Sequence, residues 1–257
     1  EELSDCEEQW QQMRRDSLPV ERYQGLEGTG LLFPHDGVFN PLLRCRQLAR
    51  EALAGGARLF ERSAATQVTS RQVTTTDGNV QCRSVIVAVD GRLDILLPEL
   101  SPRLRTARLQ MLATAPTREV SLPRPVYRRY GYEYFQQLPT GEIALGGFRD
   151  KAGAGEWTTA AEPSDAVQDR LEEFLRTSIG VAAPITHRWA ASVGYSRGSS
   201  RGILPVFTRV RGGVIACGGY NGTGNLVGSV AGRGAAQVAV TGRSEIARLF
   251  TGSDVLP

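Results

Sequence analysis

Apolar residues recur at helical spacing in three stretches of the chain. They predict an amphipathic helix over residues 3–15 and a second over residues 41–54, which Asn40 would cap. A third helix is predicted over residues 163–178, where Gly180 marks the end. Each pattern leaves one apolar stripe, which is the face that a helix of this kind turns toward a core.

Between these helices, short apolar or alternating runs predict strands. A turn at Asp77 and Gly78 predicts a hairpin. The other predicted strands cover residues 25–37, 57–60, 84–89, 132–138, 143–148 and 185–195. A helix between short strands is typical of a βαβ unit, whereas the middle of the chain reads as antiparallel sheet. This order predicts a nucleotide-binding type of domain interrupted by a second, β-rich domain.

A glycine-rich stretch near the C-terminus carries the strongest local pattern. The apolar run 214–217 predicts a buried strand, which enters a turn and then a helix of small residues. Such a turn brings backbone N–H groups and a positive helix end close to an electron-rich ligand. Small residues one helical turn apart leave a bare helix face, formed by Gly224, Gly228, Gly232 and Ala236. The pattern fits a flat cofactor or a tightly packed buried helix without a ligand equally well.

Composition restricts the partners of this protein. The 257 residues include 30 basic and 27 acidic side chains, and the resulting net charge of +3 gives no reason to expect nucleic acid. Arg124, Arg128 and Arg129 form a short basic cluster, which we interpret as a solvated strand face. No apolar run approaches the ~18 residues that a membrane-spanning helix needs. The acidic opening of the chain does not resemble a secretory signal.

The spacing of the cysteines and histidines is typical of a cytoplasmic protein and not of a metal-binding protein. The four cysteines are widely separated and form no CxxC pair, so we expect reduced and mostly buried thiols. The two histidines, His35 and His187, have no spacing typical of a zinc site, and we expect both to be structural.

Seven stretches that together span nearly the whole chain carry a resemblance: residues 33–42, 48–63, 85–91, 110–116, 131–150, 187–189 and 218–224. Their order and spacing resemble the D-amino-acid oxidase, sarcosine oxidase and glycine oxidase family of FAD-dependent oxidoreductases. Within that family they look most like the γ-glutamylputrescine oxidoreductase type. No single motif is decisive, but chance agreement over this length is improbable.

The resemblance implies a fold and a division of the chain. The expected fold is α/β, or α+β overall. An FAD/NAD(P)-binding Rossmann-like domain, incomplete at its N-terminus, would be interleaved with an antiparallel substrate domain. The substrate domain would comprise a helix and strand in residues 1–36 and the antiparallel sheet in residues 98–190. The FAD-binding domain would comprise residues 37–97 and 191–257.

The sequence also departs from the family pattern. Relatives open with a strand and GxGxxG, the motif that anchors the dinucleotide, and this chain joins the pattern after that point. After Trp189, relatives carry an Arg for the substrate carboxylate or a Cys that tethers the flavin, and neither is present here. Thr223 stands where His is common. We therefore expect non-covalent FAD, with the anchor supplied by a complementary N-terminal chain, or a homo-oligomer.

The resemblance assigns roles to individual residues. It places the isoalloxazine ring of FAD at the glycine-rich turn, with Tyr220 and Asn221 as catalytic, ring-side contacts. Cofactor-binding positions are Ala65, Ala88 and Gly91 at the adenosine end and Gly218, Gly219, Gly222, Thr223 and Gly224 at the turn. Tyr132 and Tyr134 share one face of a strand and would either line an amine pocket or lie in the core. No metal ligand is expected.

Two hypotheses of different classes follow. The first is a cytoplasmic FAD-dependent enzyme that oxidises the C–N bond of a small amine or amino acid by hydride transfer to flavin, after which the imine is hydrolysed. The second is a flavin-free, catalytically inactive remnant of this fold that acts as a binding or interaction subunit. A visible spectrum discriminates between them, because only the first hypothesis requires a bound flavin.

Overall fold

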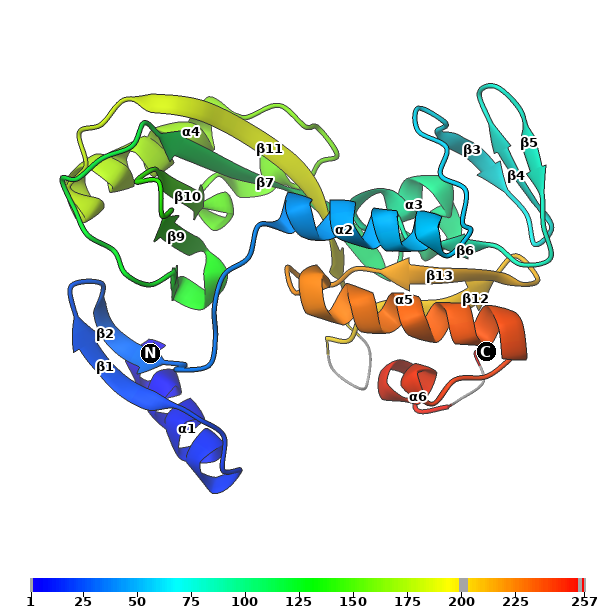
Figure 1. The fold of residues 1–257 in the computed structure, drawn as a ribbon, viewed down its shortest axis with the longest axis horizontal. Coiled ribbons are helices and arrows are strands. Elements are labelled where there is room, and N and C mark those ends of the chain that lie inside the picture. Colours follow the sequence, from blue (N-terminus) through cyan, green and yellow to red (C-terminus); the bar gives the residue numbers. More distant parts are fainter. Residues whose placement is uncertain (1, 199–202, 254–255, 257) are drawn as a thin grey trace. The chain divides into compact units, whose positions relative to one another are not determined.

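The computed structural model describes residues 2–198, 203–253 and 256 (Figure 1). The chain divides into two compact units, each assembled from separate segments. Unit 1 comprises residues 1–40, 109–154 and 162–190, and unit 2 comprises residues 41–108, 155–161 and 191–257. None of the helices in the described residues has the length and apolar character needed to span a membrane.

An antiparallel sheet forms the centre of unit 1. Its strand order is β11-β7-β10-β9-β8. These strands are β7 (Leu104–Thr114), β8 (Val126–Arg128), β9 (Glu133–Gln137), β10 (Ile143–Gly147) and β11 (Ile185–Ser196). The pairing of β9 with β10 matches the two antiparallel strands predicted on either side of residues 139–142. The first residues of β7 and the last residues of β11 belong to unit 2.

Helix α4 (Asp165–Phe174) continues into a π-helical turn, Leu175–Ile179, and packs against β10. Its inward positions Val167, Leu171 and Phe174 join a buried cluster with the strand residues Leu112, Phe135, Ile143 and Leu145. The predicted helix and its apolar stripe are therefore confirmed, with Gly180 in a left-handed conformation at its end.

Helix α1 (Glu2–Arg15) and a hairpin of β1 (Glu21–Gly25) and β2 (Gly28–Leu32) complete unit 1. No side chain of α1 is buried. The helix is joined to the segment before β9 by polar contacts: the Arg129 N–H donates to Glu2 at 2.5 Å, and the Tyr130 hydroxyl lies 2.6 Å from an oxygen of Asp5. Polar contacts on an exposed surface hold this helix less firmly than apolar burial holds α4.

A three-stranded sheet of order β12-β13-β6 forms the centre of unit 2. Its strands are β6 (Ile86–Val87), β12 (Val206–Val210) and β13 (Val214–Gly218), and β13 pairs parallel with β6 and antiparallel with β12. Side chains of β13 alternate between two cores, as the period of a strand requires. Ile215 and Cys217 join a cluster with helices α5 (Gly224–Thr241) and α6 (Glu245–Thr251). Val214 and Ala216 join the other cluster, with α3 (Leu93–Leu96).

A small antiparallel sheet lies on the α3 side of unit 2. It consists of β3 (Ala65–Val68), β4 (Gln72–Thr75) and β5 (Asn79–Gln81). The predicted hairpin at Asp77 and Gly78 is confirmed as the β4–β5 turn. Val68 connects this sheet to the buried cluster around Leu93.

Helix α2 (Pro41–Ala54) forms as predicted, but its apolar stripe is not covered. None of its side chains is buried in the described structure, and its leucines are 49–60% exposed: Leu42, Leu43, Leu48 and Leu53. Arg44 of α2 donates a hydrogen bond to the hydroxyl of Ser229 on α5. Among the described strands, β6 pairs only with β13, so its second edge has no partner there. Unit 2 thus presents an apolar helix face and a sheet edge, and additional polypeptide could pack on the first and pair with the second.

Three sequence expectations need correction. The sequence predicts a strand over residues 57–60, which form none, and the predicted strand over residues 84–89 forms only at Ile86–Val87. A strand needs backbone partners on a neighbouring strand, and none of the described strands pairs with residues 57–60. The cysteines are not mostly buried: Cys217 is buried, whereas Cys45 is exposed.

Candidate functional site

The glycine-rich turn connects the end of β13 to the start of α5, as the sequence predicts. Gly219, Asn221 and Gly222 have positive φ values of 70°, 55° and 89°. Glycine and asparagine are the residues that adopt this conformation at least cost, which explains the composition of the turn. The chain therefore leaves the sheet in a tight loop and places the start of an 18-residue helix beside the strand end.

Asp90, which sequence analysis did not single out, holds this turn in place. One of its carboxylate oxygens accepts the Gly219 N–H and the other accepts the Gly194 N–H, both at 2.9 Å. Asp90 itself has a φ of 41°, an uncommon conformation outside glycine. It follows β6, so one carboxylate links the ends of β6, β11 and β13. An aspartate just after a buried strand was the available signal, but its two partners lie more than 100 positions away in the sequence.

Gly91 allows the close approach on which this linkage depends. A Cβ atom added at Gly91 would lie 2.5 Å from the backbone oxygen of Ser192, closer than non-bonded atoms can come. At Gly194 the same added atom would lie 3.0 Å from a carboxylate oxygen of Asp90. Gly91 is needed because backbone meets backbone here, and Gly194 leaves room for the Asp90 carboxylate, whatever ligand the site takes.

We therefore expect Gly91→Ala to lower the free energy of unfolding by about 2–3 kcal/mol, because the added methyl forces the turn after β6 away from β11. Gly232→Ala is the matched control. Nothing lies within 4 Å of its added Cβ, and alanine in a helix interior is favoured over glycine by about 0.5–1 kcal/mol. Urea denaturation of both variants measures the difference. Equal stability of the two variants would show that the contact at Gly91 relaxes freely.

Backbone donors remain at the start of α5. Within the described residues, the N–H groups of Gly222, Gly224 and Asn225 have no hydrogen-bond acceptor. The hydroxyl of Thr223 donates to the Tyr220 carbonyl at 2.7 Å and does not cap the helix. These open donors, together with the positive end of the helix, fit an electron-rich group. The Gly219 N–H is not available to such a group, because it already donates to the Asp90 carboxylate.

Tyr220 and Asn221, the predicted catalytic pair, both support the turn. Tyr220 is buried in the cluster under α5, where its ring lies 3.3 Å from the position of an added Cβ at Gly224 and at Gly228. Burial raises the pKa of its phenol far above the ordinary value, so the hydroxyl stays protonated at neutral pH. The side-chain oxygen of Asn221 accepts the Ser196 N–H at 2.8 Å. Contact of either residue with a flavin ring stays a prediction.

The other predicted cofactor positions occupy different parts of unit 2. Gly91 is buried beside Asp90 and therefore lies at the glycine-rich turn. Ala88 is exposed just after β6, and Ala65 is exposed in β3, where it pairs with Thr75. The structure thus brings Gly91 to the turn and leaves Ala65 in the small antiparallel sheet.

Tyr132 and Tyr134, the predicted pocket residues, lie in and just before β9 of unit 1. Both are half-buried, and neither belongs to the buried clusters. Their neighbours Glu133 and Phe135 are the buried residues, so the tyrosines share the opposite face of the strand. The Tyr134 ring lies close to the strand β10, where an added Cβ at Gly146 would be 2.4 Å from it. The two rings thus lie outside the core, as a pocket wall requires.

Arg129 is not part of a solvated basic face, contrary to the sequence interpretation. Its guanidinium pairs with Glu133 at 2.6 Å and with Asp150 at 2.9 Å. Partial burial works to raise the pKa of Asp150, but the bonds to Arg129 outweigh it and hold that pKa below its ordinary value. The Tyr132 ring lies 5.9 Å from this guanidinium and 5.5 Å from that of Arg149. The tyrosine is therefore positioned by paired charges that local sequence could not reveal.

The two units and the glycine-rich turn define a class of fold that is also seen in solved enzyme structures. Glycine oxidase from Geobacillus kaustophilus superposes with a TM-score of 0.74 at 17% identity, covering 92% of this chain and 67% of that one. L-proline dehydrogenase from P. horikoshii superposes with a TM-score of 0.72 at 15% identity, covering 93% and 71%. At these identities the likeness concerns the fold, and it confirms the predicted mixed architecture.

Sequence comparison identifies the family. The family model described as FAD dependent oxidoreductase matches residues 3–238, so the chain belongs to this family. A curated relative, the probable oxidoreductase OrdL of Rhizobium meliloti (strain 1021), is 25% identical over 237 residues. That match covers 86% of this chain and 50% of the relative, so the chain spans about half the length of OrdL.

Proposed function

We propose that this chain forms part of an FAD-dependent oxidoreductase that oxidises the C–N bond of a small amine or amino acid. The observation that carries the proposal is the glycine-rich turn, where the start of α5 offers N–H groups without acceptors in the described residues. Membership of the FAD-dependent oxidoreductase family and the fold of the glycine oxidase support the same activity.

In this proposal the residues of the protein position the reacting groups and stabilise charge on the cofactor. FAD supplies a hydride acceptor for the carbon next to the amine nitrogen, which leaves an imine that water hydrolyses. The N–H groups of Gly222 and Gly224 stabilise negative charge on the electron-rich edge of the flavin. Asp90 fixes the turn that carries them. Tyr132 and Tyr134 wall the amine pocket, and neither has to move a proton.

Different segments of the chain bind FAD and hold the substrate. Residues 37–97 and 191–257 bind FAD, with Ala65 and Ala88 toward the adenosine end and Gly91 at the glycine-rich turn. Residues 1–36 and 98–190 hold the substrate. The protein acts in the cytoplasm, where cysteines such as the exposed Cys45 stay reduced.

The adenosine end requires a complementary polypeptide. The GxGxxG anchor is not found in this sequence. Helix α2 presents leucines to solvent, and the second edge of β6 pairs with none of the described strands. A strand added to β6, followed by a helix against α2, would cover both surfaces. This partner is either a separate chain with the anchor or an adjoining segment, with a homo-oligomer as the alternative.

The test is a visible absorption spectrum of the purified protein combined with the masses of all chains in the same sample. We expect flavin bands near roughly 375 and 450 nm whenever a complementary segment is present, and bleaching of these bands by an amine substrate. A sample that contains the complementary segment, and yet stays colourless after addition of FAD, would overturn the proposal. That result would favour the flavin-free interaction subunit.

A further inference from the structure

The glycine-rich turn contains an Asn-Gly pair at the centre of a tight reverse turn. The Thr223 N–H donates to the Tyr220 carbonyl at 2.9 Å, which closes a turn of four residues. Both central residues have positive φ values, 55° for Asn221 and 89° for Gly222. Two positive φ values are typical of a type I′ turn, and Asn-Gly is the pair that this turn prefers. The turn thus places the backbone nitrogen of Gly222 directly after an asparagine side chain.

The backbone N–H of Gly222 is open to solvent. Gly222 is exposed, and its N–H has no acceptor among the described residues. Apart from its chain neighbours, no described atom lies within 4 Å of a Cβ built on it. An N–H without an acceptor can lose its proton without the cost of breaking a hydrogen bond in the protein. This nitrogen is therefore available as a nucleophile toward the neighbouring side chain.

The side-chain amide of Asn221 is the corresponding electrophile. Its oxygen accepts the Ser196 N–H at 2.8 Å, which holds the side chain and polarises its carbonyl group. Attack on an amide carbon places negative charge on that oxygen, and an N–H donor already aimed at the oxygen stabilises this charge. The Ser196 N–H is thus arranged to assist a reaction at Cγ of Asn221.

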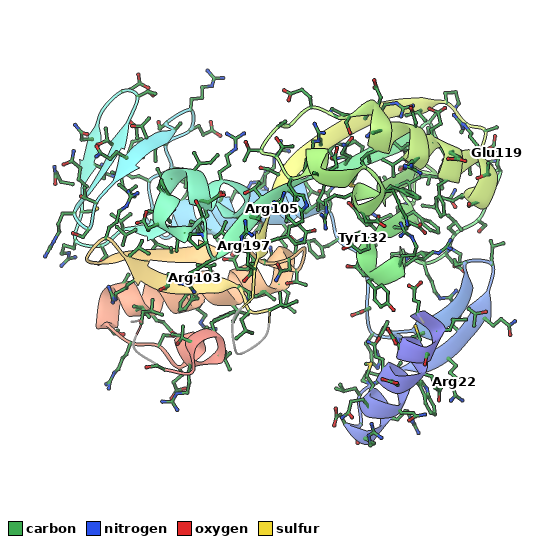
Figure 2. All side chains as sticks on the ribbon, turned by 180° about the vertical axis from the view of Figure 1, so that it is seen from behind. Arg22, Arg103, Arg105, Glu119, Tyr132 and Arg197 are labelled. Carbon is green, nitrogen blue, oxygen red and sulfur yellow. The ribbon has the colours of Figure 1, made fainter. Side chains whose placement is uncertain are left out.

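Ser196 is itself fixed on both sides. The residue before it, Tyr195, forms a strand bridge with Tyr220. The residue after it, Arg197, donates its N–H to the Arg103 carbonyl at 2.8 Å, and Figure 2 labels both arginines. A donor held between two backbone contacts keeps its direction while charge develops on the acceptor, so little reorganisation is needed.

We propose that Asn221 is a site of deamidation, with water as the only co-reactant. The Gly222 nitrogen forms a bond to Cγ of Asn221. The nitrogen loses its proton, and the side-chain nitrogen gains one and leaves as ammonia, which closes a succinimide ring. Water then opens the ring: cleavage of the bond to Cγ gives aspartate, and cleavage of the bond to the backbone carbonyl carbon gives isoaspartate. An amide is exchanged for a carboxylate, and no electrons are transferred.

The modification adds a negative charge to the turn at the start of α5. This carboxylate is attracted by the positive end of the helix and competes there with any other electron-rich group. A modified chain therefore binds flavin less well than an unmodified one. This consequence rests on the proposed function, but the modification itself does not.

The experiment incubates the protein, without added flavin, in mildly alkaline buffer. Peptide mass spectrometry follows each asparagine, and an isoaspartate methyltransferase assay detects isoaspartate. We expect Asn221 to react at least about tenfold faster than Asn79 and Asn225. These two are the matched controls in the same sample, because both are exposed and each is followed by a bulky apolar residue. Asn221→Gln should abolish the reaction, because its longer side chain has to close a larger ring.

The same incubation in urea isolates the contribution of the turn, because an Asn-Gly pair also reacts in an unfolded chain. We expect the folded protein to react at least as fast as the unfolded chain, since only the folded protein presents the Ser196 N–H to Asn221. A folded rate several-fold below the unfolded rate would overturn the proposal. Equal conversion at Asn79 or Asn225 would overturn it as well.

A comparison of fresh and aged protein separates this proposal from the proposed function. Each sample contains the complementary segment and receives FAD, and we expect lower flavin absorbance in the aged sample. Equal flavin absorbance in both samples would overturn the effect of the new charge. Flavin in neither sample would reject the proposed function, while the mass measurements would still decide whether Asn221 reacts.

Discussion

Replacing Asp90 with alanine should lower the free energy of unfolding by about 2–4 kcal/mol. The carboxylate accepts two backbone N–H groups, from Gly194 and Gly219, and both of these glycines are buried. Hydrogen bonds to charged groups contribute more than neutral ones, and a buried donor left without an acceptor costs about 1–3 kcal/mol. Urea denaturation followed by circular dichroism measures the loss.

Asp90→Asn separates the contribution of the negative charge to stability from that of the side-chain shape. Asparagine tolerates the positive φ of this position and keeps one acceptor oxygen, so it should lose roughly half as much stability as alanine. Asp90→Gly removes the backbone strain together with both bonds and should fall between the two. An Asp90→Ala variant within about 0.5 kcal/mol of the unmodified protein, the usual range for surface substitutions, would show that water replaces the carboxylate at little cost.

Elements with strong local patterns were predictable from the sequence. The helix at residues 163–178 and the antiparallel strands β9 and β10 have clear periodicity, and the structure confirms them. The strand, turn and helix around Gly219 were also predictable, because a buried apolar run and positive-φ residues lie next to each other in the chain. In these segments the information is local, and no distant partner is needed to interpret it.

Other features depend on partners far away in the sequence. Residues 57–60 have the composition of a strand but pair with none of the described strands, and the apolar stripe of α2 is left uncovered there. No local motif marks Asp90, because its structural role depends on hydrogen bonds from Gly194 and Gly219. Arg129 forms ion pairs with Glu133, four positions away, and with Asp150, which lies 21 positions away and could not be assigned to it from the sequence. Contacts of this kind are set by tertiary packing, which a single sequence does not reveal.

Replacing Arg108 with methionine should have the largest effect on stability, about 3–5 kcal/mol. Its guanidinium forms two bonds to Glu156, at 3.0 Å and 2.7 Å, and the Glu156 side chain is only 3% exposed. Removing one partner of a buried ion pair leaves the other charge without compensation in a poorly solvated place. Thermal and urea unfolding of the variant measure this loss.

The double variant Arg108→Met with Glu156→Leu tests whether the stranded charge is the cause. Apolar side chains of similar size remove both charges, so the double variant should recover at least half of the lost stability. No recovery would mean that the pair acts through geometry, by holding the loop that carries Trp157. In that case both variants would also lose the stacking of Arg105 on Trp157, in which the guanidinium carbon lies 4.1 Å from the ring centre. The stability of unit 2 and the position of Trp157 would then depend on the same ion pair.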